Sequence, residues 1–319
     1  MLSVAIRRKP DSVTEKMDEL DSLANKRLVI FGCGYVGTAV ARAAAAAGLR
    51  VEALTRNPAR AADLAALGVG TVVGDLATAA WHGGIVPGAD FALDCVSSGG
   101  GGLEGYRRSY VEGMRSILKW ARRDPVGTLI YTSSTSVYPQ DGGVEVDETA
   151  PTDGAGEMGR LLLEAEVLLR ESRGVCGRWF ILRLAGIYGP GRHHLLDQVR
   201  TGAAAITGAG DHHLNLAHRD DVCGAVMATL RAPASTADEI FNVADDGPAA
   251  KAEVVRWLAK RAGRPAPRFT GGAASARRGF ASPPDRRISS AKLKTVLGWR
   301  PRYPTFREGF APILAGDTQ

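Results

Sequence analysis

The chain has 319 residues, of which 45% are hydrophobic and 23% charged, and its formal net charge is +6. This composition fits one large or two modest globular domains, and it excludes a disordered or fibrous chain. The arginines are spread along the sequence, so we expect an anionic small-molecule substrate rather than nucleic acid. No apolar run approaches the ~18 residues of a membrane span, so we expect no membrane partner.

Cysteine and histidine usage indicates the compartment and the metal content. Four cysteines lie far apart without a C-x-x-C pair, which is typical of a reducing cytoplasm and argues against a disulfide framework or a zinc ribbon. The adjacent pairs His193-His194 and His212-His213 could serve as metal ligands. Exposed loop histidines are the commoner case, and we predict a cytoplasmic protein with no metal site.

Three segments are expected along the chain. Residues 1–25 are rich in charge and lack the apolar segment of a secretory leader, so they are predicted to be an N-terminal extension, and Met17 is an alternative start. Residues 26–190 are predicted to form a nucleotide-binding domain. Residues 191–319 are predicted to be mainly a smaller substrate lobe, with some segments returning to the main sheet.

From residue 28 onward, short apolar runs alternate with helical stretches, which is typical of a parallel sheet covered by helices on both faces. The predicted strands are Leu28–Phe31, Arg50–Thr55, Thr71–Val73, Phe91–Cys95, Thr128–Thr132 and Trp179–Leu184. The predicted helices are Gly37–Ala47, Ala59–Leu67, Tyr106–Arg122 and Gly159–Glu171. The fold class is therefore α/β, a doubly wound parallel sheet of the Rossmann type, whose ligand lies beyond the carboxyl ends of the strands.

The first strand runs directly into a Gly-x-Gly-x-x-Gly turn and an alanine-rich helix, an arrangement that lets the backbone approach a diphosphate. We expect Gly32 to allow the tight turn, Gly34 to leave room for the phosphates, and Gly37 to let the helix pack on the strand. The N–H groups at the helix start attract phosphate charge. The motif therefore predicts dinucleotide binding.

The end of the second strand indicates which dinucleotide binds. An NAD site usually has a carboxylate there, whereas an NADP site offers an arginine to the 2′-phosphate. This chain has Thr55 and Arg56 at the tip and no acid, which favours NADP(H) over NAD(H). After the third strand, Asp75 could accept a hydrogen bond from the adenine amino group or could cap a helix.

Five further motifs occur in order: YTSSTSVYP at 131–139, RLAGIYGPG at 183–191, NLAHRDDV at 215–222, FNV at 241–243 and LGWRP at 297–301. With them the chain resembles the extended short-chain dehydrogenase/reductase superfamily, in its NAD-dependent epimerase/dehydratase branch. The resemblance implies a Rossmann domain, a substrate lobe and a possible homodimer through two helices. Together with the glycine turn, it gives an expected cofactor-binding set of Gly32, Gly34, Tyr35, Val36, Gly37, Thr55, Arg56, Asp75, Leu76, Ser97 and Tyr188.

The resemblance also implies a catalytic Ser, Tyr and Lys, in which the Tyr moves the proton and the Lys lowers its pKa. Ser134 takes the place of the serine. The Tyr-x-x-x-Lys pair is missing: one alignment puts Gly156 and Arg160 at these positions, and a shift by two residues puts Met158 and Leu162 there. We therefore take Ser134, Arg160 and Glu157 as the candidate catalytic residues.

Two hypotheses follow. The first is a reductase-like or epimerase-like enzyme that acts on a nucleotide sugar or another small polar substrate with an atypical catalytic set. The second is a catalytically silent NADP(H)-binding sensor or scaffold. Further candidates for the missing proton donor, beside Glu157, are Tyr110, Tyr138, Tyr188, His193 and His194.

Overall fold

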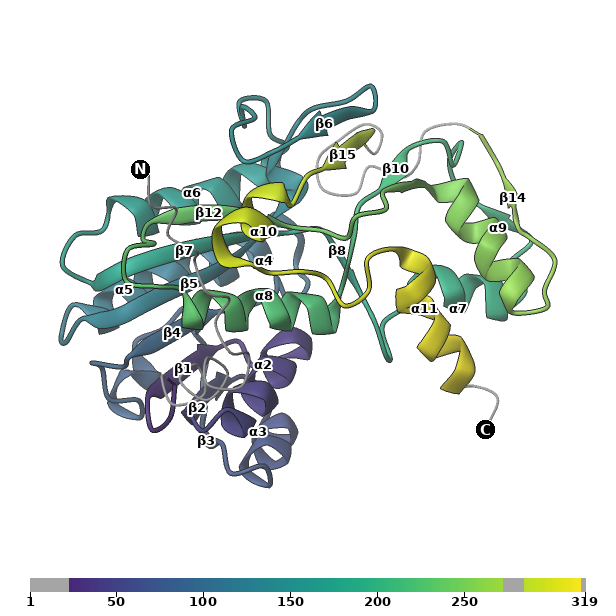
Figure 1. Ribbon diagram of the computed structural model, residues 1–319. Helices are drawn as coiled ribbons and strands as arrows, with labels where there is room; N and C mark the ends of the chain where they lie inside the picture. Colours follow the sequence, from purple (N-terminus) through teal and green to yellow (C-terminus); the bar gives the residue numbers. More distant parts are fainter. Residues whose placement is uncertain (1–22, 272–283, 317–319) are drawn as a thin grey trace, which may run out of the picture.

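The computed structural model describes residues 23–271 and 284–316. Nearly all of the predicted extension at 1–25 therefore lies outside the described residues. At the centre is a seven-stranded sheet in the order β12-β7-β5-β4-β1-β2-β3, in which every neighbouring pair is parallel (Figure 1). The predicted fold class, a doubly wound α/β sheet of the Rossmann type, is confirmed.

The bounds of the elements are as follows. The central sheet contains β1 (Arg27–Phe31), β2 (Arg50–Thr55), β3 (Gly70–Val73), β4 (Phe91–Asp94), β5 (Val126–Ser134), β7 (Cys176–Leu184) and β12 (Glu239–Val243). Paired short strands are β6 (Val144–Val146) with β15 (Arg286–Ile288), β8 (Gly186–Tyr188) with β11 (Leu216–His218), β9 (Ala205–Ile206) with β14 (Arg268–Phe269), and β10 (His213–Leu214) with β13 (Ala249–Ala250). The α-helices are α2 (Tyr35–Ala46), α3 (Pro58–Ala65), α4 (Gly102–Tyr106), α5 (Gly113–Ala121), α6 (Glu157–Glu171), α7 (His194–Arg200), α8 (Arg219–Arg231), α9 (Lys251–Arg261), α10 (Ala291–Leu297) and α11 (Phe306–Ala315).

Alternating side chains of β1 explain why both faces of the sheet are covered. Leu28 and Ile30 join an apolar cluster that includes residues of α2 and α8, whereas Val29 and Phe31 join the cluster of α5 and α6 on the other face. The Phe31 ring meets Trp120 edge to face, with the ring centroids 5.3 Å apart. Because successive strand residues point to opposite faces, a strand covered on both sides must be apolar throughout.

The C-terminal part has an apolar cluster of its own, built from α7, α9 and α11 around Leu258 and Phe310. In Figure 1 these helices lie beside the sheet rather than on its faces. After α8 the chain returns to the main sheet as β12, which pairs with β7 from Glu239 to Val243. In the described part of the chain, no helix has the length and apolar character to cross a membrane.

The helix predicted over Tyr106–Arg122 is interrupted. A π-helical segment, Arg107–Glu112, separates α4 from α5. Such segments widen the helix by one residue and often occur at functional sites. The prediction missed it because apolar periodicity does not distinguish a π turn from an α turn.

Candidate functional site

The glycine turn lies between β1 and α2, at the carboxyl edge of the sheet. Gly32 has a φ of +81°, and a Cβ there would lie 2.6 Å from the Val96 Cα, while a Cβ at Gly37 would lie 2.9 Å from the Cys95 Sγ. A Cβ at Gly34 would have the Gly32 O, 3.9 Å away, as its nearest neighbouring atom. The outer glycines therefore permit close packing of the chain on itself, whereas the middle one keeps the space before the helix open.

The start of α2 suits a phosphate group. Its N-cap, Gly34, offers no side-chain cap, and the first turn carries no acidic residue. The Gly34 N–H donates to the Gly32 O at 2.7 Å, whereas the N–H groups of the first turn lack an acceptor within the helix and face no acidic side chain of that turn. The open space beside Gly34 is therefore a cradle that a side chain would fill.

A hollow at the tips of β2 and β3, which we call the β2 pocket, adjoins this cradle. It is lined by Gly32, Leu54, Thr55, Arg56, Gly74, Asp75, Leu76, Ala77, Val96, Ser97 and Ser109. The structure thus brings five predicted cofactor residues together with Gly32: Thr55, Arg56, Asp75, Leu76 and Ser97.

Arg56 is the basic group of the β2 pocket. A Cβ on Gly99 would lie 2.3 Å from the Arg56 Nη2, so the guanidinium rests directly on the glycine-rich loop that follows β4. Glu52, the acid nearest to Arg56 in sequence, does not neutralise Arg56 because it pairs with Arg27. The tip of β2 therefore carries a cation and no carboxylate.

Asp75 is held by the protein on both oxygens. Its Oδ2 pairs with the Arg108 Nη2 at 2.8 Å, and its Oδ1 accepts from the Ala77 N at 3.0 Å. Burial raises the pKa of this carboxyl, but the hydrogen bonds from Arg108 and Ala77 outweigh that effect and hold the pKa below its usual value. The Ala77 hydrogen bond closes a turn after β3, and no helix begins at Asp75, so the helix cap considered for this residue is not present.

A second hollow, the β5 cleft, shares Gly32, Val96 and Ser97 with the β2 pocket and reaches the end of β5. Its lining residues are Gly32, Gly34, Tyr35, Val36, Cys95, Val96, Ser97, Tyr106, Tyr110, Thr132, Ser133, Ser134, Leu162, Leu184, Ala185, Gly186, Ile187 and Arg192. Four of the predicted residues found only in this hollow are Gly34, Tyr35, Val36 and Ser134. Tyr106 and Arg192 belong to it as well, although no motif pointed to them.

The two serines at the end of β5 differ in their partners. The Ser133 hydroxyl donates to the Glu166 Oε1 at 2.6 Å, within a buried ion pair in which the Arg183 Nη2 lies 2.7 Å from the Glu166 Oε2. The Ser134 Oγ instead accepts from the Ser136 N at 3.2 Å. Ser134 therefore retains its own proton for a group in the cleft.

Two tyrosines line the cleft from the helical side. Tyr106 ends α4, Tyr110 lies in the π-helical segment, and their ring centroids are 5.2 Å apart. Tyr110 is near enough to the buried Tyr131 of β5 to contribute to raising its pKa, of which burial is the main cause. The phenol of Tyr110 thus approaches the end of the sheet.

Two tyrosines of the sequence motifs lie elsewhere. The Tyr188 ring stacks on Phe310 with the centroids 4.6 Å apart, inside the C-terminal cluster, and burial raises the pKa of its hydroxyl. The Tyr138 hydroxyl donates to the Asn242 Oδ1 at 2.8 Å and accepts from Arg183. Neither side chain lines the hollows, so the structure does not bring Tyr188 to the other expected cofactor residues.

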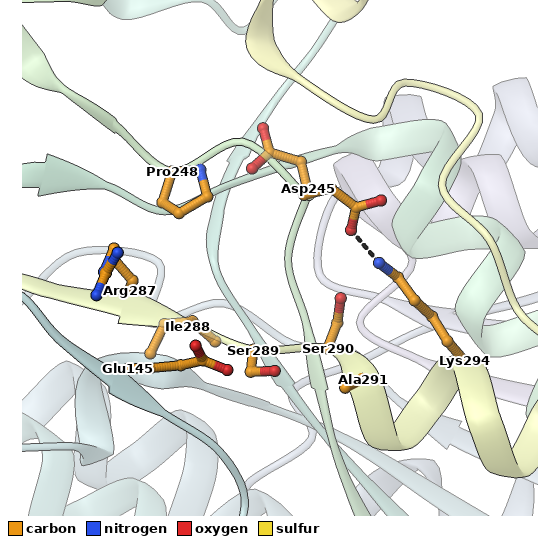
Figure 2. Close-up of a pocket in the computed structure, with 10 residues that line it drawn as sticks. Glu145, Asp245, Pro248, Arg287, Ile288, Ser289, Ser290, Ala291 and Lys294 are labelled. Carbon is orange, nitrogen blue, oxygen red and sulfur yellow. Dashed lines mark hydrogen bonds and ion pairs between the residues drawn. The ribbon is translucent and has the colours of Figure 1, made fainter.

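A third hollow lies between β15, α10 and the loop after β12 (Figure 2). Its two cations already have protein partners, since Lys294 pairs with Asp246 and the Arg287 Nε donates to the Gly143 O at 3.0 Å. Burial raises the pKa of Asp245 to about 8, which favours the neutral acid. None of its lining residues comes from the glycine turn or from β5. Across residues 23–271 and 284–316, no three His, Cys, Asp or Glu side chains are grouped to hold a metal ion.

Comparison with known proteins identifies the family. The model of the NAD dependent epimerase/dehydratase family matches residues 28–244, a stretch that includes the glycine turn, β5 and both hollows beside them. The chain belongs to this family. It is 31% identical over 195 residues to Protein YeeZ of Escherichia coli K12, a match that covers 61% of this chain and 65% of YeeZ.

A further relative and a solved structure are also similar to the chain. Over 218 residues the chain is 27% identical to a 3-diazoavenalumate denitrifying reductase of a Streptomyces species, with 63% of this chain and 70% of the reductase covered. MoeE5, solved with UDP-glucose and NAD, has a TM-score of 0.77 at 21% identity over 92% of this chain and 98% of MoeE5. That likeness shows a shared fold.

Helix α6, where the family's Tyr-x-x-x-Lys is expected, presents Leu162 to the cleft. Arg160 is exposed and its Nη1 donates to the Ala155 O at 3.0 Å, and Glu157 is exposed in the first turn. Two residues along an α-helix correspond to a rotation of about 200°, so Arg160 and Leu162 cannot face the same way. The structure thus favours the alignment with Met158 and Leu162, and it leaves Arg160 and Glu157 outside the cleft.

Proposed function

We propose that the chain is an NADP(H)-preferring, reductase-like enzyme that acts on a small polar substrate, with nucleotide-linked compounds among the candidates. The observation that carries the proposal is an open cradle at Gly34 in a cleft that shares Gly32, Val96 and Ser97 with the pocket at the β2 tip, where Arg56 stands without an acid. Membership of an NAD-dependent family and the likeness to a reductase support it.

The residues present fit a dinucleotide. The diphosphate would lie at Gly34, and Thr55 and Arg56 would take the 2′-phosphate of the adenine ribose. The adenosine would occupy the β2 pocket and the nicotinamide the β5 cleft. When bound, the nicotinamide supplies the hydride.

Within the β5 cleft, Ser134 and Tyr110 would handle the oxygen and the proton of the substrate. The Ser134 hydroxyl would donate a hydrogen bond to the reacting oxygen, since its Oγ already accepts from Ser136. Tyr110 would give the proton, because Leu162 and Met158 have no acidic proton to donate. This assignment replaces Arg160 and Glu157 as candidate catalytic residues.

The test is NADPH oxidation by the purified full chain with a panel of carbonyl compounds and sugar nucleotides. With an active compound, Tyr110→Phe is expected to lower kcat by about 100-fold, the low end for a general acid, while the Kd for NADPH is unchanged. Tyr303→Phe, which changes a tyrosine that lines neither the β2 pocket nor the β5 cleft, is the matched control and should retain kcat. Tight NADPH binding without turnover of any compound would contradict the proposal and favour the sensor or scaffold hypothesis.

A further inference from the structure

Three segments that are distant in sequence meet around Tyr35, the residue after Gly34. The Tyr35 hydroxyl donates to the Pro190 O at 3.0 Å, in the loop after β8. A Cβ on Gly189 would lie 2.7 Å from the same hydroxyl and 3.3 Å from the Arg219 Cβ at the start of α8. The loop after β8 therefore packs directly against the first turn of α2.

Two arginines pack on the Tyr35 ring at this junction. The guanidinium carbon of Arg192 lies 5.6 Å from the ring centroid, and that of Arg219 lies 5.2 Å from it. The Arg192 backbone is fixed by two hydrogen bonds of 3.0 Å with Gly189, one in each direction. Two cations are thus held beside the open start of α2.

The two guanidinium groups differ in how far they are neutralised. The Arg219 Nη2 pairs with the Asp220 Oδ1 at 2.9 Å. For Arg192, no ion pair is recorded among the described residues, and its side chain lines the β5 cleft together with Gly34 and Tyr35. A cation–π contact at an exposed site is weak and uses the ring face, so it orients the guanidinium and leaves its N–H donors available.

We propose that Arg192, and to a smaller extent Arg219, bind the diphosphate of the dinucleotide across the start of α2. The loop after β8 would then close the cofactor site from the side opposite the glycine turn. A guanidinium matches two phosphate oxygens with parallel hydrogen bonds, which the backbone N–H groups of α2 alone do not provide. The inference rests on the proposed function, since it needs the dinucleotide in this cleft.

The test is calorimetric binding to the full chain of ADP-ribose 2′-phosphate, which has the diphosphate and no nicotinamide, and of adenosine 2′-monophosphate, which lacks the diphosphate. Arg192→Gln is expected to raise the Kd of the first probe about tenfold and to leave the second unchanged, because only the first reaches the arginine. Arg219→Gln should have a smaller effect, and Arg192→Lys should recover part of the loss. Arg122→Gln, at the exposed end of α5, is the control.

The outcomes separate the two proposals. If the wild-type chain binds neither probe, both the proposed function and this inference are wrong. If it binds both probes and Arg192→Gln binds the diphosphate probe as the wild type does, only this inference is wrong, and a phosphate on the substrate becomes the better partner for Arg192. Equal losses for both probes would instead indicate a general disturbance of the fold and would also overturn the inference.

Discussion

Replacing Arg56 by alanine should change the cofactor preference. The guanidinium lies on Gly99 at the rim of the β2 pocket, where it can bond a 2′-phosphate. A hydrogen bond to a charged group contributes about 1.5–3 kcal/mol, and since the Arg56 side chain is exposed to screening solvent, we take the lower end. The expected loss is about 1.5 kcal/mol, or about tenfold in the Kd for NADPH, with the Kd for NADH nearly unchanged.

The assay is fluorescence titration of both reduced dinucleotides against the wild type and the variants. Arg56→Lys should fall between the wild type and Arg56→Ala, because it keeps the charge and loses the second hydrogen bond. Gly99→Ala should also weaken NADPH selectively, because its Cβ would meet the guanidinium at 2.3 Å and the residue has a φ of +65°. Equal losses for NADPH and NADH in Arg56→Ala would refute the assignment of the 2′-phosphate to this arginine.

Three further predictions concern stability and the glycine cradle. Glu166→Gln should lower the free energy of unfolding in urea by about 3–5 kcal/mol, because it leaves a buried arginine unpaired, whereas Asp63→Asn at an exposed pair should cost less than about 1 kcal/mol. Gly34→Ala should weaken dinucleotide binding in calorimetry with little change in the melting temperature, whereas Gly32→Ala should lower the melting temperature because of the contact with Val96. Burial raises the folded-state pKa of Asp245 to about 8 from 3.8, so its stabilising contribution is present below pH 4 and is lost as the pH rises towards 8. Asp245→Asn should remove this part of the pH dependence of urea unfolding. Identical pH profiles for the wild type and Asp245→Asn would contradict this prediction.

Much of the fold could be predicted because burial on both faces requires runs such as Leu28–Phe31 to be apolar throughout. The glycine turn was equally visible, since Gly32 and Gly37 are required by close packing that no other residue tolerates. The exact bounds of the helices and their interruptions were harder to predict from the sequence. The π-helical segment at Arg107–Glu112 packs against α6, a contact between distant segments that local sequence does not report.

The candidate site was predictable on its nucleotide side and less so on its substrate side. Thr55 and Arg56 follow directly from the end of a strand, and the structure brings them to one pocket. On α6, by contrast, the sequence allowed two alignments, and the structure distinguishes them because Leu162 lines the cleft while Arg160 is exposed. Arg192 was missed because its position depends on a loop held by Tyr35, a contact between residues far apart in the chain.

The most direct test of the account is a crystal structure of the full chain with NADPH. We expect the 2′-phosphate within hydrogen-bond distance of Arg56, the diphosphate against Gly34, and the nicotinamide ring in the β5 cleft with the Ser134 and Tyr110 hydroxyls facing the space above its C4 atom. A 2′-phosphate turned away from Arg56, or a nicotinamide whose C4 faces only apolar side chains such as Leu162, would contradict the account.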